Sequence, residues 1–329
     1  MSRFILMDTA NLFFRARHAM KAPDLDMKVG MGFHIMLNSV KSIWQTYQGD
    51  HVVFFLEGRS WRKDFYPRYK ANRHNVVRTE REQEEEKVFW EAYDSFVTYL
   101  KEKTNCSVFQ SPKAEADDLI ARFIDLHPNH EHIIVSTDSD LHQLLAPNVS
   151  QYNGIEEYII TTKGFFQLKN NKPVIDKKTN APKKALDPEW LLFEKSIRGD
   201  ATDNIFTAYP RVRTKQLKEA FDDIVRGGYA WNNLMLSKWE DHEKNVHVVK
   251  DLYERNKKLI DLRAQPEEII DEMDKSMLTL LEQKQNLSLA QIGGYFMKFC
   301  GKWNLIRISE TPTQYTEFLN AGYPFMEKV

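Results

Sequence analysis

Short apolar runs that end in acidic residues constrain the fold of this chain more than any other feature. The runs, with the acids that follow them, are 3–7 with Asp8, 51–56 with Glu57, and 133–135 with Asp138 and Asp140. Runs of this length are typical of buried strands, and segments with helical periodicity separate them. Strands that alternate with helices predict an α/β fold with a mostly parallel sheet. The acidic side chains would then meet at the carboxyl ends of the strands, where ligands bind in such sheets.

Helical segments are expected between these strands. Residues 30–48 carry apolar side chains at helical spacing. Residues 79–103 begin with acids and end with lysines, which suits the helix dipole. A short strand near 107–110 precedes Ser111 and Pro112. A serine N-cap followed by proline predicts that the next helix begins at this point.

The pattern changes in the second half of the chain. Another helix is expected from Leu141 onward, and residues 169–184 form a segment rich in lysine, asparagine and proline. Beyond residue 186 the periodicity is mostly helical. We therefore predict an α/β domain of residues 1–186 and a smaller helical region of residues 187–329.

The composition excludes several classes of protein. A chain of 329 residues with 42% apolar and 28% charged residues can bury a core, which argues against disorder. Cys106 and Cys300 are the only cysteines, so neither a disulfide framework nor a cysteine zinc site is expected. No stretch approaches the ~18 apolar residues of a membrane span, and Asp8 interrupts the first apolar run too early for a secretory signal. We therefore expect a soluble, cytoplasmic protein.

Further acidic residues form two motifs. Glu115, Asp117 and Asp118 lie on the first turns of one expected helix, and Asp200 and Asp203 lie three residues apart. Taken singly, each acid could cap a helix or a loop. Together in one cleft, carboxylates repel one another unless cations bind or their pKa values rise. The set predicts a site for hard divalent ions, Mg²⁺ or Mn²⁺, and two such ions would support phosphodiester hydrolysis.

An aspartyl-phosphate phosphatase is the competing chemistry on a similar sheet. That reaction needs a second aspartate two residues after the nucleophile. Here Asp8 is followed by Thr9-Ala10-Asn11, so this alternative is weak.

Residues 59–73 combine basic and aromatic side chains and carry a net charge of +5. Cations that hold phosphates, interleaved with aromatic faces that stack on bases, are typical of single-strand binding. The basic residues of this segment are Arg59, Arg62, Lys63, Arg68, Lys70 and Arg73. The alternative is an amphipathic helix with a solvated basic face, in which Trp61 and Phe65 pack in the core.

Two further segments are basic. Residues 169–184 also carry a net charge of +5 and read most simply as a flexible loop, with DNA contact as a further possibility. A third basic run, just beyond Asp203, consists of Arg211, Arg213, Lys215 and Lys218. A run so close to the expected metals could grip the phosphates of a duplex.

Taken in order, these motifs resemble those of the flap endonuclease / 5′→3′ exonuclease superfamily, which has a PIN-like core. They are Asp8, Trp61-Arg62-Lys63 through Tyr69-Lys70-Ala71-Asn72-Arg73, Glu115-Ala116-Asp117-Asp118, Thr137-Asp138-Ser139-Asp140 and Gly199-Asp200-Ala201-Thr202-Asp203-Asn204. The resemblance covers roughly residues 3–225. Within the superfamily the chain is most similar to the ribonuclease H group of T-even-like bacteriophages.

The resemblance implies a helical arch or bridge at about 60–104 and a helix–turn–helix-type element for duplex DNA at about 199–228. It also implies a structure-specific 5′-3′ exonuclease or flap endonuclease that leaves a 5′-phosphate and a 3′-hydroxyl. Its substrates would be branched or nicked DNA and RNA/DNA with a 5′ end or flap, so that it removes RNA primers during replication. A monomer is expected, and a single-strand-binding protein or a sliding clamp is a conceivable partner.

The resemblance also assigns roles to single residues. The first of two Mg²⁺ or Mn²⁺ ions would be surrounded by Asp8, Glu57, Glu115, Asp117 and Asp138. The second would be served, partly through water, by Asp118, Asp140, Asp200 and Asp203. Lys70 and Arg73 would contact the scissile phosphate, and Tyr69 would stack on a base near the cleavage point. Nucleic acid would be bound by Arg59, Arg62, Lys63, Arg68, Arg211, Arg213, Lys215 and Lys218.

The chain departs from the pattern of the superfamily at two places. Glu57 stands where the family usually has the shorter aspartate, and we expect it to reach the metal directly or through water. The usual Gly-Val-x-Gly-Ile-Gly hairpin is absent from residues 205–213, so a bound monovalent cation is not expected there. Separately, residues 291–296 resemble a clamp-binding peptide only superficially, because Gly294 stands where an apolar side chain is required.

Two other functions compete with the nuclease prediction. A DNA-binding homologue without catalysis would lack carboxylates that this chain retains, and a compact PIN-type ribonuclease for single-stranded RNA would lack residues 59–73 and 199–218. The net charge of −1 fits a nuclease, because nine carboxylates in one cleft leave a net charge of +8 on the remaining chain.

Overall fold

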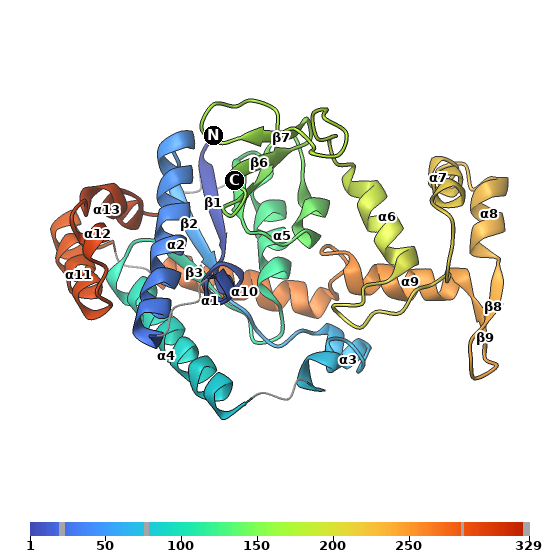
Figure 1. The fold of residues 1–329 in the computed structure, drawn as a ribbon, viewed down its shortest axis with the longest axis horizontal. Helices are drawn as coiled ribbons and strands as arrows, with labels where there is room; N and C mark the ends of the chain where they lie inside the picture. The colour runs from blue at the N-terminus through green and yellow to red at the C-terminus, as the bar shows by residue number, and fades with distance from the viewer. Residues whose placement is uncertain (20–23, 76–78, 284–285, 325–329) are drawn as a thin grey trace.

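The computed structural model describes residues 1–19, 24–75, 79–283 and 286–324. A seven-stranded sheet with the order β3-β2-β1-β4-β5-β6-β7 lies at its centre (Figure 1). The strands are β1 (Arg3–Asp8), β2 (His51–Phe55), β3 (Ser107–Phe109), β4 (Glu131–Val135), β5 (Val149–Asn153), β6 (Tyr158–Thr161) and β7 (Gly164–Gln167). The strands β1 to β5 pair in parallel, whereas β6 and β7 pair antiparallel. The predicted α/β fold with a mostly parallel sheet is confirmed.

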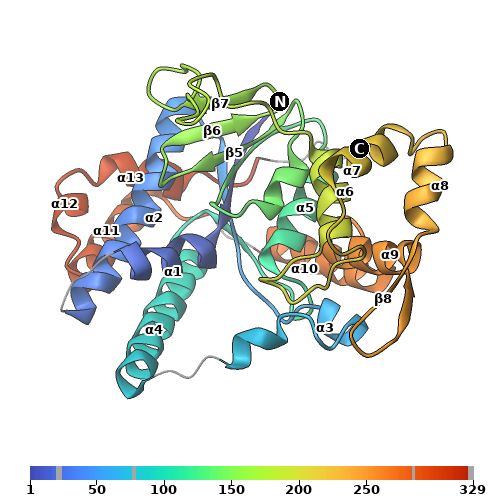
Figure 2. The ribbon, with the colours of Figure 1, turned by 45° about the vertical axis from the view of Figure 1, so that its right-hand side comes forward.

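Alternate side chains of β1 enter two different cores, because successive residues of a strand point to opposite faces of a sheet. Ile5 and Met7 pack with residues of α2 (Leu25–Tyr47) and α4 (Glu80–Lys103). Phe4 and Leu6 pack with residues of α5 (Ala116–Leu126) and α10 (Glu267–Gln283) on the other face. Figure 2 shows α4 extending away from the sheet toward the side on which α3 lies. Helices thus cover both faces of the sheet.

Four helices after residue 187 form a lobe beside the sheet (Figure 1). They are α6 (Pro188–Arg198), α7 (Thr214–Asp222), α8 (Tyr229–Met235) and α9 (Val249–Ile260), with a hairpin of β8 (Lys238–Glu240) and β9 (Val246–Val248). The lobe has its own core, which includes Phe193, Leu217 and Tyr253. By contrast, α10 packs on the sheet, as do residues of the C-terminal helices. The predicted helical region thus contains a short hairpin, and its helices divide between the core of the lobe and the cores on the two faces of the sheet.

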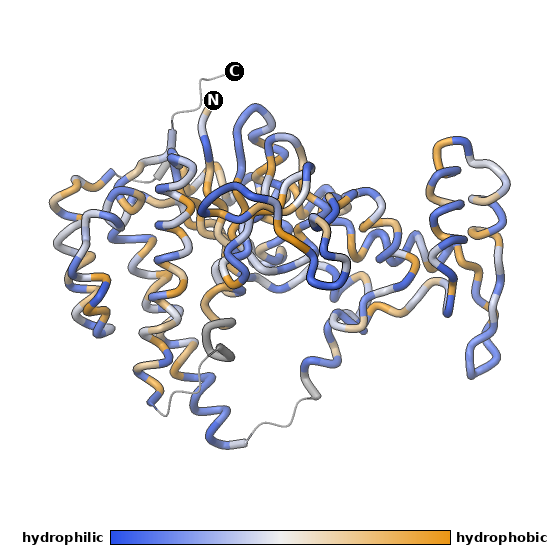
Figure 3. The backbone as a smooth tube through the Cα atoms, turned by 45° about the horizontal axis from the view of Figure 1, so that its top comes forward, coloured by the Kyte–Doolittle hydropathy of each residue, from blue (hydrophilic) through white to orange (hydrophobic). Residues whose placement is uncertain are grey.

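The remaining helices are short or belong to the sheet-facing layer. They are α1 (Thr9–Ala19), α3 (Arg62–Phe65), η1 (Ala71–Asn75), η2 (Asp140–Leu144), α11 (Leu289–Lys302), α12 (Ile306–Ser309) and α13 (Thr313–Asn320). Hydrophilic and hydrophobic residues alternate along many helices (Figure 3), as expected where one face meets a core. The clamp-like segment 291–296 lies within α11 and buries Ile292 and Phe296. Within the described residues, no helix combines the length and the hydropathy that crossing a membrane requires.

Two sequence-based predictions of helices were wrong. The helix expected at Ser111 begins at Ala116, because the preceding carbonyls bind another segment: those of Pro112 and Lys113 accept the backbone N–H groups of Arg59 and Trp61. The helix expected from Leu141 is only the single 3₁₀ segment η2. In the first case long-range backbone contacts outweighed the local signal.

The lysine-rich residues 169–184 have more regular structure than an irregular loop. Isolated bridges join Phe166 to Pro173 and Ile175 to Pro182, so the chain folds back twice along the edge of β7. The backbone N–H of Lys183 donates to the carbonyl of Val174. This segment therefore extends the antiparallel edge of the sheet.

Candidate active site

The carboxyl ends of β1 and β4 bring Asp8 and Asp138 together. The Ser136 hydroxyl donates to Asp8 Oδ2 at 2.8 Å and accepts the backbone N–H of Asp138 at 3.0 Å. Burial raises the pKa of Asp8 to about 6, and the charge of Asp138 adds to this effect. Asp138 itself is exposed and accepts the backbone N–H of Asp140. Asp8 and Asp138 thus lie together at the carboxyl ends of the strands, as predicted from the sequence.

Glu57 follows β2, the neighbour of β1. Its Oε2 accepts the backbone N–H of Ala116 at 3.2 Å, which orients the carboxylate toward the start of α5. Part of the Glu57 side chain is exposed to solvent. Burial of its carboxyl group raises its pKa to about 7, and the charges of Asp8 and Glu115 add to this effect. Burial is the main cause of both raised pKa values, and the neighbouring carboxylates add to it, as expected where acids lie together without enough positive charge.

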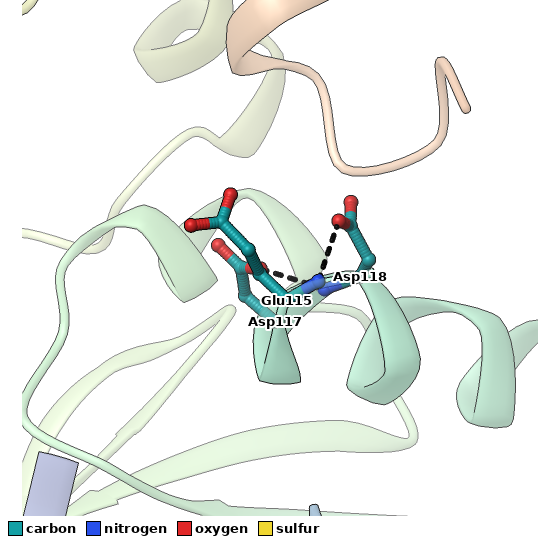
Figure 4. Close-up of side chains that lie close together, drawn as sticks. All are labelled: Glu115, Asp117 and Asp118. Carbon is teal, nitrogen blue, oxygen red and sulfur yellow. Dashed lines mark hydrogen bonds between the residues drawn. The ribbon is translucent and has the colours of Figure 1, made fainter. Parts of the chain in front are cut away.

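The first turn of α5 carries three acids whose carboxylate oxygens approach within 4.8 Å of one another. Glu115 is the N-cap, and its backbone N–H donates to Asp118 Oδ2 at 3.2 Å. Figure 4 shows Glu115 and Asp117 pointing to one side while Asp118 turns away from them. Burial, followed by the charges of Asp118 and Glu115, raises the pKa of Asp117 well above its usual value. A cation beside Asp117 would therefore favour its ionised form.

Arg62 is buried against Asp118, which corrects two predicted roles. Its guanidinium donates to both oxygens of Asp118, at 2.7 and 2.8 Å, and it is 1% exposed. The Arg62 Nε also donates to the carbonyl of Leu259 in α9. A side chain held in this way cannot reach a nucleic-acid backbone. Asp118 is likewise committed to Arg62, so it joins α5 to α9 and lies apart from Asp140, Asp200 and Asp203.

Tyr69 and Lys70 also point inward, toward the acids. The Tyr69 hydroxyl donates to Glu115 Oε2 at 2.9 Å and lies 3.0 Å from Asp203 Oδ2. The Lys70 ammonium donates to Glu115 Oε1 and lies 3.7 Å from Asp203 Oδ2. Although burial opposes ionisation of Glu115, Lys70 and Arg62 outweigh it and hold its pKa below the usual value. Tyr69 is only 3% exposed, so the predicted stacking on a base is not available in this conformation.

A second acidic group lies at the C-terminal end of α6. It consists of Asp140, Asp200 and Asp203, whose oxygens also approach within 4.8 Å of one another. The Lys195 ammonium bridges this group, because it donates to Asp140 Oδ1 and lies 2.7 Å from Asp200 Oδ2. Sequence analysis did not identify Lys195. Its position one helical turn before the Gly-Asp motif was the available signal.

The local backbone explains why the second group forms. Gly199 ends α6 with φ of 77°, and an added Cβ would lie 2.4 Å from the carbonyl oxygen of Ile205. Asp200 and Ile205 exchange backbone hydrogen bonds of 2.8 and 2.7 Å. This tight loop holds Asp200 and Asp203 toward the strand ends. Arg73 then donates to Asp203 Oδ1 at 2.7 Å from outside.

Asp117 of the first group and all three acids of the second group line one pocket of about 420 Å³. Its charged lining consists of Asp117, Asp138, Asp140, Asp200, Asp203, Lys70, Arg73 and Lys195. Its acids offer oxygen ligands only, which suits Mg²⁺ or Mn²⁺ and not a soft metal. A larger hollow of about 670 Å³ lies between α2 and the α11–α12 turn, but the two acidic groups do not line it. The smaller pocket is therefore the candidate active site.

The other predicted nucleic-acid contacts lie on the surface. Lys63 is partly exposed and Arg59 and Arg68 are exposed, although Arg59 pairs with Asp64 at 2.5 Å. Phe65 is 43% exposed, which corrects the idea that it packs in a core, whereas Trp61 is buried. The third basic run surrounds the start of α7, and all four of its cations, Arg211, Arg213, Lys215 and Lys218, are exposed.

Comparison with known protein families identifies a match over the first half of the chain. Residues 3–174 match the family model described as the 5′-3′ exonuclease, N-terminal resolvase-like domain. DNA polymerase I of Rhizobium leguminosarum is 28% identical over 240 residues, which are 67% of this chain and 21% of that protein. The flap endonuclease Xni of Shewanella piezotolerans is 28% identical over 171 residues, which are 51% of this chain and 62% of that protein. The chain thus spans less than two thirds of the length of either relative.

Solved structures show the same fold over nearly the whole chain. The D15 protein of bacteriophage T5, crystallised with metal ions, is 21% identical with a TM-score of 0.58 and covers 84% of this chain and 99% of that one. The T5 D15 flap endonuclease in a complex with DNA and metal ions is 22% identical with a TM-score of 0.59, and covers 85% and 100%. At these identities the comparison establishes the fold.

Proposed function

We propose, because the chain belongs to the 5′-3′ exonuclease family with an N-terminal resolvase-like domain, that it is a divalent-metal-dependent 5′-nuclease. Its substrates would be branched or nicked DNA and RNA/DNA with a 5′ end or flap. Its role would be to remove RNA primers and 5′ flaps from replicating DNA. The observation that carries the proposal is one pocket in which five carboxylates meet three cations at the strand ends.

The acids would divide between two ions. Asp8, Glu57, Glu115, Asp117 and Asp138 would hold the first, and Asp140, Asp200 and Asp203 the second. Bound there, two divalent ions would activate water and stabilise the leaving oxygen of a phosphodiester. Asp118 is left out of this set because Arg62 binds both of its oxygens. The raised pKa values of Asp8 and Glu57 support the proposal, since bound cations would supply the missing positive charge.

The cations of the pocket would bind the substrate phosphates. Lys70 and Arg73 both reach Asp203 from η1 and the residue before it, so their charges lie at the mouth of the acidic pocket. Exchange of these carboxylate contacts for a phosphate would place the scissile bond beside the metals. Lys195 would neutralise Asp140 and Asp200 until an ion or a substrate takes its place.

The lobe of α6 to α9 would bind duplex DNA. Its exposed cations Arg211, Arg213 and Lys215 lie just after the loop that positions Asp203. Duplex phosphates bound by these cations would lie at a fixed distance from the pocket, because the same backbone segment carries the cations and Asp203. We propose residues 199–228 as the duplex-binding element and residues 1–186 as the main part of the nuclease core.

Cleavage of a 5′-labelled flap duplex tests the proposal. Wild-type protein should release the label with Mg²⁺, and EDTA should stop the reaction. The Asp138→Asn, Asp140→Asn double variant should lose at least about 10²-fold in rate, because both acids line the pocket. Full cleavage by this double variant would refute the assignment of both residues. Binding without cleavage by the wild type would instead support a catalytically inactive DNA-binding homologue.

A further inference from the structure

Aromatic rings and cations gather on one surface where α3 meets α9. The Lys258 ammonium of α9 lies 4.3 Å from the centre of the Phe65 ring, at the end of α3. One turn earlier on α9, the Arg255 guanidinium lies 5.1 Å from the centre of the Tyr66 ring. We call this surface, together with two neighbouring residues, the junction patch; it consists of Phe65, Tyr66, Arg68, Phe206, Arg255 and Lys258.

Phe206 connects the junction patch to the loop that carries Asp203. The Arg68 guanidinium lies 5.7 Å from the centre of the Phe206 ring, and Arg255 donates to the Phe206 carbonyl at 3.3 Å. The Asn204 side-chain amide also donates to the carbonyl of Arg68, at 2.7 Å. These contacts hold the patch beside the loop whose acid lines the candidate active site.

The cations of the junction patch are not neutralised by the acids around them. Asp64, the acid next to Phe65 in the sequence, pairs with Arg59. Glu254, one turn before Lys258 on α9, pairs with Lys250. Within the part of the chain that the structure describes, the three cations of the patch contact rings, an amide and a backbone carbonyl, and no carboxylate. The patch therefore attracts anions.

The rings of the junction patch are open to solvent. Phe206 is 50% exposed and Phe65 is 43% exposed, so neither ring contributes fully to a core. Exposed rings interleaved with cations suit a single-stranded nucleic acid, whose bases stack on the rings while its phosphates meet the cations. In a duplex the faces of the bases are already stacked on one another and are not available to such rings.

We propose that the junction patch binds an unpaired strand of nucleic acid. Phe65 and Phe206 stack on its bases, and Arg68 and Lys258 hold its phosphates. Arg255 supports Phe206 from below through the backbone carbonyl. This inference rests on the proposed function, because the strand is the single-stranded part of the branched substrate. It adds a site for unpaired bases to the cations proposed above for the duplex.

Fluorescence anisotropy with a single-stranded oligothymidylate of about 12 nucleotides tests the proposal. The measurement is made in EDTA, which prevents cleavage, and a blunt duplex is titrated in parallel. The Phe65→Leu, Phe206→Leu double variant should bind the oligothymidylate about 10-fold or more weakly, because leucine has no flat face on which a base can stack. Its affinity for the blunt duplex should match that of the wild type.

The salt dependence of the same binding reports on the phosphate contacts. The Arg68→Gln, Lys258→Gln double variant should reduce the slope of log affinity against log salt by about 1.4 for the oligothymidylate, since two phosphate contacts are lost. Lys302→Gln is the matched control, because Lys302 is also an exposed lysine over a ring, at 5.0 Å from that of Trp303. It lies on α11, far from α9 in both views of the ribbon (Figures 1 and 2), and should leave the slope unchanged.

The other outcomes separate this inference from the proposed nuclease. Wild-type affinity of Phe65→Leu, Phe206→Leu for the oligothymidylate, with flap cleavage intact, would refute the junction patch and leave the nuclease standing. An equal loss of affinity for the blunt duplex would also refute it, because the rings would then not select unpaired bases. If the wild type binds the oligothymidylate through the patch but does not cleave the flap with Mg²⁺, the strand-binding site stands and the proposed nuclease function fails.

Discussion

Arg62 shows how the surroundings of one residue decide its role. Its sequence neighbours are basic and aromatic, which is typical of a nucleic-acid contact. In the fold it is the counter-ion of Asp118 and a donor to the carbonyl of Leu259, with 1% of its surface exposed. The same segment keeps Arg59 in solvent. One motif therefore contributes both a buried structural cation and surface cations.

Replacing Arg62 by methionine should destabilise the protein by about 3–5 kcal/mol, because Asp118 would remain as a buried charge without its partner. Arg59→Met is the control, and removing its exposed pair with Asp64 should leave the stability nearly unchanged because solvent screens the pair. Urea unfolding of the two variants measures the difference. A stable Arg62→Met protein with weakened DNA binding would instead support the surface role.

Lys195 acts as an internal counter-ion for the second acidic group. Lys195→Met should lower the stability in EDTA by about 1–3 kcal/mol, because Asp140 and Asp200 lose a hydrogen-bonded charge. Added Mg²⁺ should recover more stability in this variant than in the wild type, since the ammonium no longer competes for the carboxylates. Thermal unfolding with and without Mg²⁺ measures this gain. Lys250→Met, an exposed lysine on α9, should show neither effect. The same Mg²⁺ gain in both variants would contradict this role of Lys195.

At the scale of elements, the C-terminal end of α6 positions the second acidic group. The helix stops at Gly199, and the chain returns through the Asp200–Ile205 bridge so that two acids reach the strand ends. The usual glycine-rich hairpin of the superfamily is absent from the following residues. The tight loop nevertheless forms, because it depends on the positive φ of Gly199 and not on the sequence of the hairpin.

Gly199→Ala should disrupt this loop. Its Cβ would lie 2.4 Å from a backbone oxygen at a φ of 77°, so the backbone must move and Asp200 and Asp203 with it. We expect the free energy of unfolding to fall by more than about 3 kcal/mol and the rate of flap cleavage to fall. Gly227→Ala is the control: its φ is 55°, but nothing lies within 4 Å of the added Cβ, so only about 1–2 kcal/mol of conformational strain is expected. If both variants lost the same stability, the added Cβ at position 199 would fit without a clash, which would contradict the prediction.

For the whole molecule, a buried histidine ties stability to pH. His132 Nε2 donates to the carbonyl of His127, its Nδ1 has no partner among the described residues, and its ring stacks on Phe4. Burial lowers the pKa of His132 to about 4, because protonation would bury a charged donor without an acceptor. His127 in turn bonds Tyr323, so this cluster joins the sheet to the C-terminal segment.

His132 should therefore contribute a loss of stability in mild acid, whereas the raised pKa values of Asp8 and Glu57 act in the opposite direction. The neutral His132 contributes its full stabilisation above pH 6.5, and this contribution falls as the pH drops toward 4, by about 2 kcal/mol at pH 5. Urea unfolding between pH 7.5 and 5 measures the slope, to be compared with that of His132→Gln, which lacks the titrating group. His242→Gln replaces an exposed ring and should keep the wild-type slope. An unchanged slope in His132→Gln would assign the acid sensitivity to other groups.

The amino-acid sequence by itself determined the strands β1 to β4, their alternation with helices, and the acids at the strand ends, because these depend on local periodicity and on short motifs. The strands β5 to β7 were not predicted. The sequence motifs were also sufficient to identify the family. The helix start at Ala116 was not predictable, since distant backbone groups occupy the carbonyls of the preceding residues. The lysine-rich edge of the sheet likewise depends on pairing with β7.

Only the tertiary structure decided which charges neutralise one another. Arg62 pairs with Asp118, Lys70 with Glu115 and Lys195 with Asp140, and each of these partners lies 45 or more residues away along the chain. Sequence spacing carries no information about such pairs, because the Coulomb energy depends on distance and burial. The same reason explains why Asp118, though part of the acidic motif, pairs with Arg62.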